Sequence, residues 1–137
     1  MSGPLRLACV LLSFSLVAAA PPPVSEEDVD PNAPEVQACA AFALESFNYF
    51  SQDLHLYAIA SFYSVKRENI GGGKYVMEVE VRETLCLKGP LADLSSCHAL
   101  TSSEAKVFRC RFIVLSAPWK RQRFLLESSC TPSGVPP

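Results

Sequence analysis

Histidine and cysteine are the side chains that most often carry catalysis or bind metal ions, and here they are placed for neither task. The two histidines are His55, between loop and strand patterns, and His98, directly after Cys97. An adjacent Cys-His pair lacks the spacing of metal ligands. A cysteine nucleophile needs a thiolate and a nearby base, but Cys39 lies on an alanine- and phenylalanine-rich segment where desolvation keeps a thiol neutral.

Acidic residues and short motifs give no stronger indication of an enzyme. Glu78 and Glu80 alternate with apolar residues, which places them on the polar face of a strand, where a solvated surface is far more common than a catalytic carboxylate pair. The sequence contains no Gly-x-Ser-x-Gly or His-Glu-x-x-His motif and no phosphate-binding glycine loop. We therefore interpret the chain as a binding protein, not an enzyme, with no metal and no cofactor.

The residues best suited to binding lie in a glycine-rich stretch at positions 67–75. Its three consecutive glycines, at positions 71–73, permit positive φ angles and let the backbone approach another surface closely. Because the stretch separates two runs rich in β-branched and aromatic residues, it predicts the tip of a β-hairpin. A simple turn is the more common use of such glycines, and a contact surface is the alternative.

A second hairpin tip is predicted at residues 116–120. Pro118 blocks ladder pairing, and Trp119 is a large aromatic residue among polar neighbours. Trp119 is either a packed turn residue or a contact. The basic stretch 120–123 that follows is either a solvated strand end or a patch that steers the protein toward an acidic partner.

Length and composition predict a secreted single domain. The 137 residues, 49% of them hydrophobic, suffice for one domain with a core. Residues 1–20 combine an early arginine, a short apolar run and terminal small residues, which predicts a secretory signal peptide and no membrane span. Without Arg6 the chain has 11 basic and 14 acidic residues, a net charge of −3, which argues against a nucleic-acid partner.

Loss of the signal peptide leaves five of the six cysteines in an oxidising compartment, so at most two disulfides form and one thiol remains. Cys86 and Cys97 enclose a loop with turn residues, and closing a loop of this size contributes about 3 kcal/mol. Cys110 and Cys130 lie roughly symmetrically about the second hairpin tip. For Cys39 we expect a buried thiol and a monomer; an intermolecular disulfide, giving a dimer, is the alternative.

Apolar periodicity predicts one helix followed by antiparallel strands. Residues 21–33 are rich in Pro, Asp and Glu and predict a flexible arm, whereas residues 34–50 show helical spacing with Pro34 suited to the first turn. The uncharged segment 131–137 predicts a disordered tail. Four further apolar runs predict strands at residues 56–65, 75–85, 108–114 and 124–128.

These features together resemble the type 2, secreted cystatins. The matching stretches are residues 36–48 of the helix, 75–80 and 84–86 of one strand, and Ala117-Pro118-Trp119. The resemblance covers residues 34–130 and implies an α+β fold in which one N-terminal helix is wrapped by a curved antiparallel sheet of four to five strands. It also implies two disulfides, Cys86–Cys97 and Cys110–Cys130.

The function implied by the resemblance is reversible inhibition of papain-like cysteine peptidases of the cathepsin type. Members of the family enter the active-site cleft with an N-terminal segment containing a glycine, a Gln-x-Val-x-Gly first hairpin and a Pro-Trp second hairpin. By this comparison the peptidase-binding residues are Glu68, Asn69, Ile70, Gly71, Gly72, Pro118 and Trp119.

This chain departs from the family motif in the first hairpin and in the arm. Glu68 stands where the family has glutamine and Ile70 where it has valine, whereas Gly72 is retained. The arm contains no glycine, and Gln52 stands where relatives that inhibit legumain have asparagine. We therefore expect a degenerate first inhibitory hairpin and weakened inhibition, with a non-inhibitory extracellular binding protein of cystatin fold as the alternative.

Overall fold

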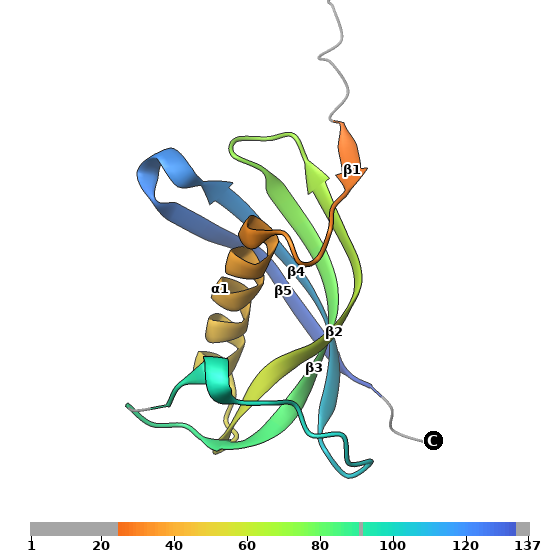
Figure 1. The fold of residues 1–137 in the computed structure, drawn as a ribbon, viewed down its shortest axis with the longest axis vertical. Coiled ribbons are helices and arrows are strands. Elements are labelled where there is room, and N and C mark those ends of the chain that lie inside the picture. The colour runs from red at the N-terminus through yellow and green to blue at the C-terminus, as the bar shows by residue number, and fades with distance from the viewer. Residues whose placement is uncertain (1–24, 91, 134–137) are drawn as a thin grey trace, which may run out of the picture.

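The structure is a computed structural model that describes residues 25–90 and 92–133. One helix lies in the concave face of a curved antiparallel sheet of five strands in the order β1-β2-β3-β4-β5 (Figure 1). This confirms the expected α+β architecture. The elements are β1 (Glu26–Asp28), α1 (Pro34–Phe50), β2 (His55–Glu68), β3 (Lys74–Leu87), β4 (Val107–Ala117) and β5 (Gln122–Pro132), with short 3-10 turns η2 (Leu94–Ser96) and η3 (Pro118–Lys120).

The helix α1 begins and ends where its sequence predicts. Pro34 occupies the first turn, where its missing N–H costs no hydrogen bond, and the chain leaves the helix at Ser51 with extended backbone. Its buried face recurs every three to four residues and consists of Val36, Cys39, Ala40, Ala43, Leu44 and the polar Asn48. The small residues of this face let the helix lie close against the sheet.

The sheet contributes the other half of the core from one side of its alternating strands. On β3 the buried residues are Tyr75, Met77, Val79 and Val81, and on β4 they include Phe112 and Val114. Fully burying a side chain of this kind contributes about 1.5–3 kcal/mol. The core is therefore a helix stripe packed against one sheet face.

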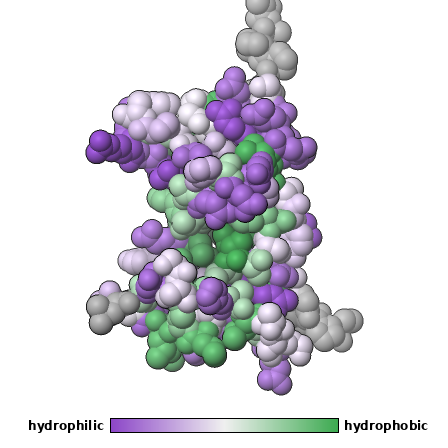
Figure 2. All heavy atoms as spheres, viewed as in Figure 1, coloured by the Kyte–Doolittle hydropathy of each residue, from purple (hydrophilic) through white to green (hydrophobic). Residues whose placement is uncertain are grey.

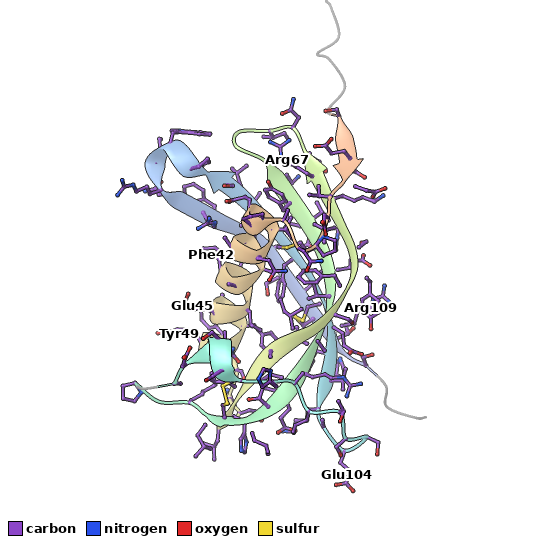
Figure 3. The ribbon with its side chains drawn as sticks, in the orientation of Figure 1. Phe42, Glu45, Tyr49, Arg67, Glu104 and Arg109 are labelled. Atoms are coloured by element: carbon purple, nitrogen blue, oxygen red, sulfur yellow. A yellow bond between two sulfur atoms is a disulfide. The ribbon has the colours of Figure 1, made fainter. Side chains whose placement is uncertain are left out.

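The opposite, outer face of the sheet carries paired charges. Glu78 forms an ion pair with Arg109 at 3.0 Å, and Glu80 pairs with Arg82 at 3.0 Å. Figure 3 shows Arg109 on this side of the sheet, away from the helix. The two glutamates thus form the solvated strand face that their alternation indicated, and such exposed pairs contribute at most about 1 kcal/mol each.

Both disulfides have the expected partners. Cys86 is bonded to Cys97, and Cys110 to Cys130, its direct neighbour across β4 and β5. Cys39 forms no disulfide among the described residues and is 0% exposed. Burial, reinforced by the nearby carboxylate of Glu35, raises the pKa of the Cys39 thiol to about 11. The structure therefore supports the expected buried thiol over an intermolecular disulfide, since a bond to a second chain needs an accessible sulfur.

Two expectations about the chain ends need correction. Residues 26–28 of the expected flexible arm form β1, which pairs with residues 66–68 of β2. All three residues of β1 are exposed, and it is held by backbone pairing and by ion pairs such as Lys66–Glu26 at 3.4 Å, so apolar periodicity could not reveal it. Likewise Thr131 and Pro132, expected in the disordered tail, continue β5 opposite β4. The predicted signal peptide and residues 134–137 lie outside the described residues.

Hydrophobic and hydrophilic surface are unevenly distributed. In Figure 2 hydrophilic and neutral side chains predominate at the end of the molecule that carries the hairpin tips, whereas hydrophobic side chains gather at the opposite end. The large exposed apolar residues near the helix C-terminus and the neighbouring strand ends are Tyr49, Phe50, Leu54, Leu85 and Leu87. Among the described residues, no helix is long and apolar enough to cross a membrane.

Candidate functional site

The first hairpin tip is the five-residue connection 69–73 between β2 and β3. Gly71 and Gly73 have φ angles of 59° and 121°, which side chains other than glycine rarely adopt. The Gly73 N–H donates to the carbonyl of Ile70 at 2.8 Å and closes the turn. Ile70 is 39% exposed at this tip. The glycine stretch is therefore a hairpin tip, as its sequence indicates.

Glu68 lies at the base of this hairpin instead of at its tip. It is the last residue of β2 and faces Lys74, the first residue of β3, across the ladder. The two side chains form an ion pair at 3.3 Å, and the Glu68 side chain is only 21% exposed. The carboxylate of Glu68 is thus already paired within the chain.

The second tip is the turn η3 between β4 and β5. Pro118 opens the turn, and Arg121 leaves it with a φ angle of 52°. The Arg121 N–H donates to the carbonyl of Pro118 at 3.0 Å. Trp119 is 64% exposed, and one side of its indole lies beside Gly71 and Gly72 of the first tip.

The two tips contact each other through Gly72. The Gly72 N–H donates to the carbonyl of Ser116 at 3.0 Å, and the Ser116 N–H donates to the carbonyl of Gly73 at 2.9 Å. A Cβ atom on Gly72 would lie 2.4 Å from Cδ of Pro118 and 3.1 Å from Cζ3 of Trp119. Gly72 is therefore required for the tips to pack, a role that the hairpin pattern alone did not reveal.

The N-terminal segment reaches the same end of the molecule. The carbonyl of Ser25, the first described residue, accepts a hydrogen bond from Asn69 N–H at 3.1 Å. Glu27 on β1 pairs with Arg67 on β2 at 3.7 Å, and Arg67 also donates to the carbonyl of Gly72 at 3.4 Å. Figure 3 shows Arg67 on the strand just before the first tip. Three separate segments of the chain thus form one edge, which we call the tip edge: residues 25–27, 68–74 and 116–121.

The other residues singled out from the sequence lie elsewhere. His55 begins β2 opposite Leu87, and Gln52 follows the helix C-terminus, at the end of the molecule away from the tip edge (Figure 1). His98 follows the disulfide-bonded Cys97 in a loop. In the described part of the chain, no group of three or more His, Cys, Asp or Glu residues is placed to hold a metal ion. The tip edge holds the residues that the sequence singled out for binding, and it is the candidate site.

A helix cradled by a curved antiparallel sheet, with two hairpin tips joined at one end and two disulfides, defines a cystatin-like protein. Residues 25–119 match the family model described as "Cystatin domain". The chain belongs to the cystatin family, whose members are protease inhibitors and not enzymes.

Similar proteins extend over most of the chain. A cystatin of Coturnix japonica is 38% identical over 117 residues, covering 85% of this chain and 96% of that protein. A cystatin of Gallus gallus is 37% identical over 117 residues, covering 85% of this chain and 80% of that protein. Among solved structures, dimeric human cystatin F superposes with a TM-score of 0.74 at 24% identity, covering 89% of this chain and 97% of that one.

Proposed function

We propose that this protein is a secreted, reversible inhibitor of papain-like cysteine peptidases of the cathepsin type, and that its tip edge enters the active-site cleft. The observation that carries the proposal is the contact between Gly72 and the Pro118-Trp119 turn, which joins two hairpins into one continuous edge. Residues 1–20 act as the signal peptide, and the secreted chain is a monomer.

The proposed interface combines close backbone approach with an aromatic anchor. At residues 71–72 the glycine backbone reaches the peptidase's catalytic groups with no side chain to hold it away. The exposed indole of Trp119 fills a neighbouring apolar patch, and an anchor of this kind is worth about 2–4 kcal/mol of binding free energy. Ile70, Asn69 and Pro118 complete the contact surface.

The Glu68–Lys74 pair weakens the complex without abolishing it. Binding that covers the base of the first hairpin removes water from both charges, and their mutual attraction only partly offsets this desolvation. A neutral glutamine at position 68 removes the carboxylate's part of this cost, and the ammonium of Lys74, on a long side chain that is 28% exposed, stays in contact with water. The inhibitor is therefore weaker than relatives with glutamine there, but Glu68 does not enter the interface as an unpaired charge.

Titration of papain and cathepsin L with the refolded, disulfide-bonded protein tests the proposal. We expect reversible inhibition, and absence of inhibition at micromolar protein rejects it. Glu68→Gln should tighten binding by about three- to tenfold, because a partly screened charge at an interface costs about 1 kcal/mol. Glu80→Gln is the matched control, since the Glu80 side chain is also 21% exposed and forms an ion pair with Arg82 at 3.0 Å, farther along β3 from the tip edge.

The alternative function is an extracellular binding protein of cystatin fold without inhibitory activity. The charged pair at the base of the first hairpin is the observation that favours it, because the family motif has a neutral residue at that position. The same variants distinguish the two functions. In a non-inhibitory binding protein, Glu68→Gln does not create inhibition, whereas in an inhibitor it raises the affinity for the peptidase.

A further inference from the structure

Ser116 connects three elements at the base of the second hairpin. Its backbone forms both hydrogen bonds to the first tip, with Gly72 and Gly73. Its hydroxyl donates to Oε1 of Glu35, on the first turn of α1, at 2.7 Å. Ser116 is 1% exposed, so this hydroxyl has little access to water and depends on Glu35 as its partner.

Glu35 also binds the strand that faces Ser116. Arg123 lies directly opposite Ser116 in the β4–β5 ladder. Its Nη2 donates to both carboxylate oxygens of Glu35 at 3.2 Å, and its Nε donates to Oε1 at 3.3 Å. One carboxylate on the helix thus holds both strands of the second hairpin, and charge-assisted bonds of this kind are the stronger ones in proteins.

The contact of Glu35 with Ser116 and Arg123, which we call the junction, lies close to the second tip. Beyond the Ser116–Arg123 pair, the β4–β5 ladder contains only the pair Ala117–Gln122 before the turn begins. Burial raises the pKa of Glu35, but the hydrogen bond from Ser116 and the charge of Arg123 outweigh this effect and hold the pKa below its usual range. Glu35 is therefore a carboxylate at neutral pH.

We propose that Glu35 is a positioning residue for the tip edge: by holding Ser116 and Arg123 together, it fixes the second tip against the helix and, through the Ser116 backbone, the first tip against the second. The inference rests on the proposed inhibitory function, because its consequence is preorganisation. An edge that is already ordered loses less conformational entropy when it binds, so the complex gains affinity without any new contact to the peptidase.

Exchange of the Gly72 amide hydrogen tests the junction in the free protein, without any peptidase. The Gly72 N–H bonds to Ser116, so its protection reports the contact between the two tips directly. Glu35→Gln removes the charge but keeps the side-chain shape. We expect it to accelerate Gly72 exchange about tenfold, because a neutral amide binds Ser116 and Arg123 less strongly than a carboxylate does, and partial exposure limits the difference.

Glu127→Gln is the matched control. Glu127 pairs with Arg111 across the same two strands at 3.4 Å, and its side chain is 37% exposed, against 35% for Glu35. This control should leave Gly72 exchange unchanged. Ser116→Ala is a second variant that breaks the link without altering the helix, and it should accelerate exchange as Glu35→Gln does. Circular dichroism of each variant verifies the fold.

Peptidase binding provides the second readout. Glu35→Gln should raise the dissociation rate of the complex with papain about tenfold, and Trp119→Ala should cost less in the Glu35→Gln background than in the wild type. Additive effects, which a residue acting only on global stability would give, overturn the proposal. So does an unchanged Gly72 exchange rate in Glu35→Gln.

The two proposals fail separately. If the wild type inhibits and Glu35→Gln matches Glu127→Gln in both readouts, the positioning role is overturned while the inhibitory function stands. If the wild type does not inhibit, the proposed function is rejected, whereas accelerated Gly72 exchange in Glu35→Gln still supports Glu35 as the residue that orders the edge.

Discussion

Replacing Gly72 with alanine should separate the two hairpin tips. A Cβ atom at this position would lie 2.4 Å from Cδ of Pro118 and 2.8 Å from the carbonyl oxygen of Ser116. Both atoms belong to rigid groups, a proline ring and the backbone. Because ordinary contacts begin near 3.4 Å, the tips must move apart by about 1 Å and lose the hydrogen bond from Gly72 to Ser116.

The expected loss of affinity for papain follows from the displacement of Trp119. A shift of this size displaces Trp119, an anchor worth about 2–4 kcal/mol, relative to the first tip. If half of that contribution is lost, inhibition of papain weakens by about 5- to 30-fold. Unfolding free energy should fall less, by about 0.5–1.5 kcal/mol for one hydrogen bond, because the contact lies outside the core.

Two other glycines provide the controls. Alanine at Gly71 is strained by the φ angle of 59° but meets its nearest neighbour at 3.4 Å, so Gly71→Ala adds a methyl group to the proposed contact surface without separating the tips. A larger loss of inhibition in Gly72→Ala than in Gly71→Ala is therefore the effect of displacement. Alanine at Gly89 meets nothing within 4 Å. The assay is titration of papain activity with each variant, together with urea unfolding. If Gly72→Ala inhibits within twofold of the wild type, the contact between the tips does not shape the binding edge.

Three further predictions concern charge, pH and the free thiol. Lys120 and Arg121 are exposed beside Trp119 and form no ion pair with any described residue. Lys120→Ser should therefore slow association with a peptidase whose cleft rim is acidic by about two- to threefold at low salt. In stopped-flow measurements this difference should vanish at high ionic strength. Asp53 accepts hydrogen bonds from Tyr57 and Lys106, which lower the pKa of its carboxyl, so its stabilising effect is present above the unfolded pKa of about 4 and is lost as the pH falls through the lower folded value. Asp53→Asn should therefore reduce stability by about 1 kcal/mol at pH 7 but have little effect near pH 2, and equal losses at both pH values in urea unfolding would contradict this assignment. The Cys39 thiol, buried and with its pKa raised to about 11, should react with iodoacetamide at pH 8 only after denaturation, and rapid alkylation or a disulfide-linked dimer in non-reducing mass spectrometry would refute its burial.

Local patterns along the chain determined most of the fold. Helical spacing predicted α1 at residues 34–50, and the structure places it at Pro34–Phe50. Alternation along residues 75–81 identified the inner and outer faces of β3, and glycine and proline located both tips. At the end of β3 the alternation was wrong, because Thr84 is buried and Leu85 is 75% exposed. These features were readable because each depends on neighbours within a few residues.

The boundaries of the outer elements were less readable. The three residues of β1 are all acidic and exposed, so no apolar residue marks a buried face of this strand. It is an edge strand held by backbone pairing and exposed ion pairs. β5 runs to Pro132 because pairing with β4 continues past the Cys110–Cys130 disulfide. Neither property leaves a periodic trace in the local sequence.

By itself, the sequence determined which residue types stand at the tips: consecutive glycines at one, with Glu68 shortly before them, and a proline-tryptophan pair at the other. Only the tertiary structure decided how these residues act together. It packs Gly72 against Pro118, pairs Glu68 with Lys74, and joins Glu35 to Ser116 and Arg123 across 81 and 88 residues. Contacts so distant along the chain depend on how the helix and the strands pack, and no local pattern encodes them.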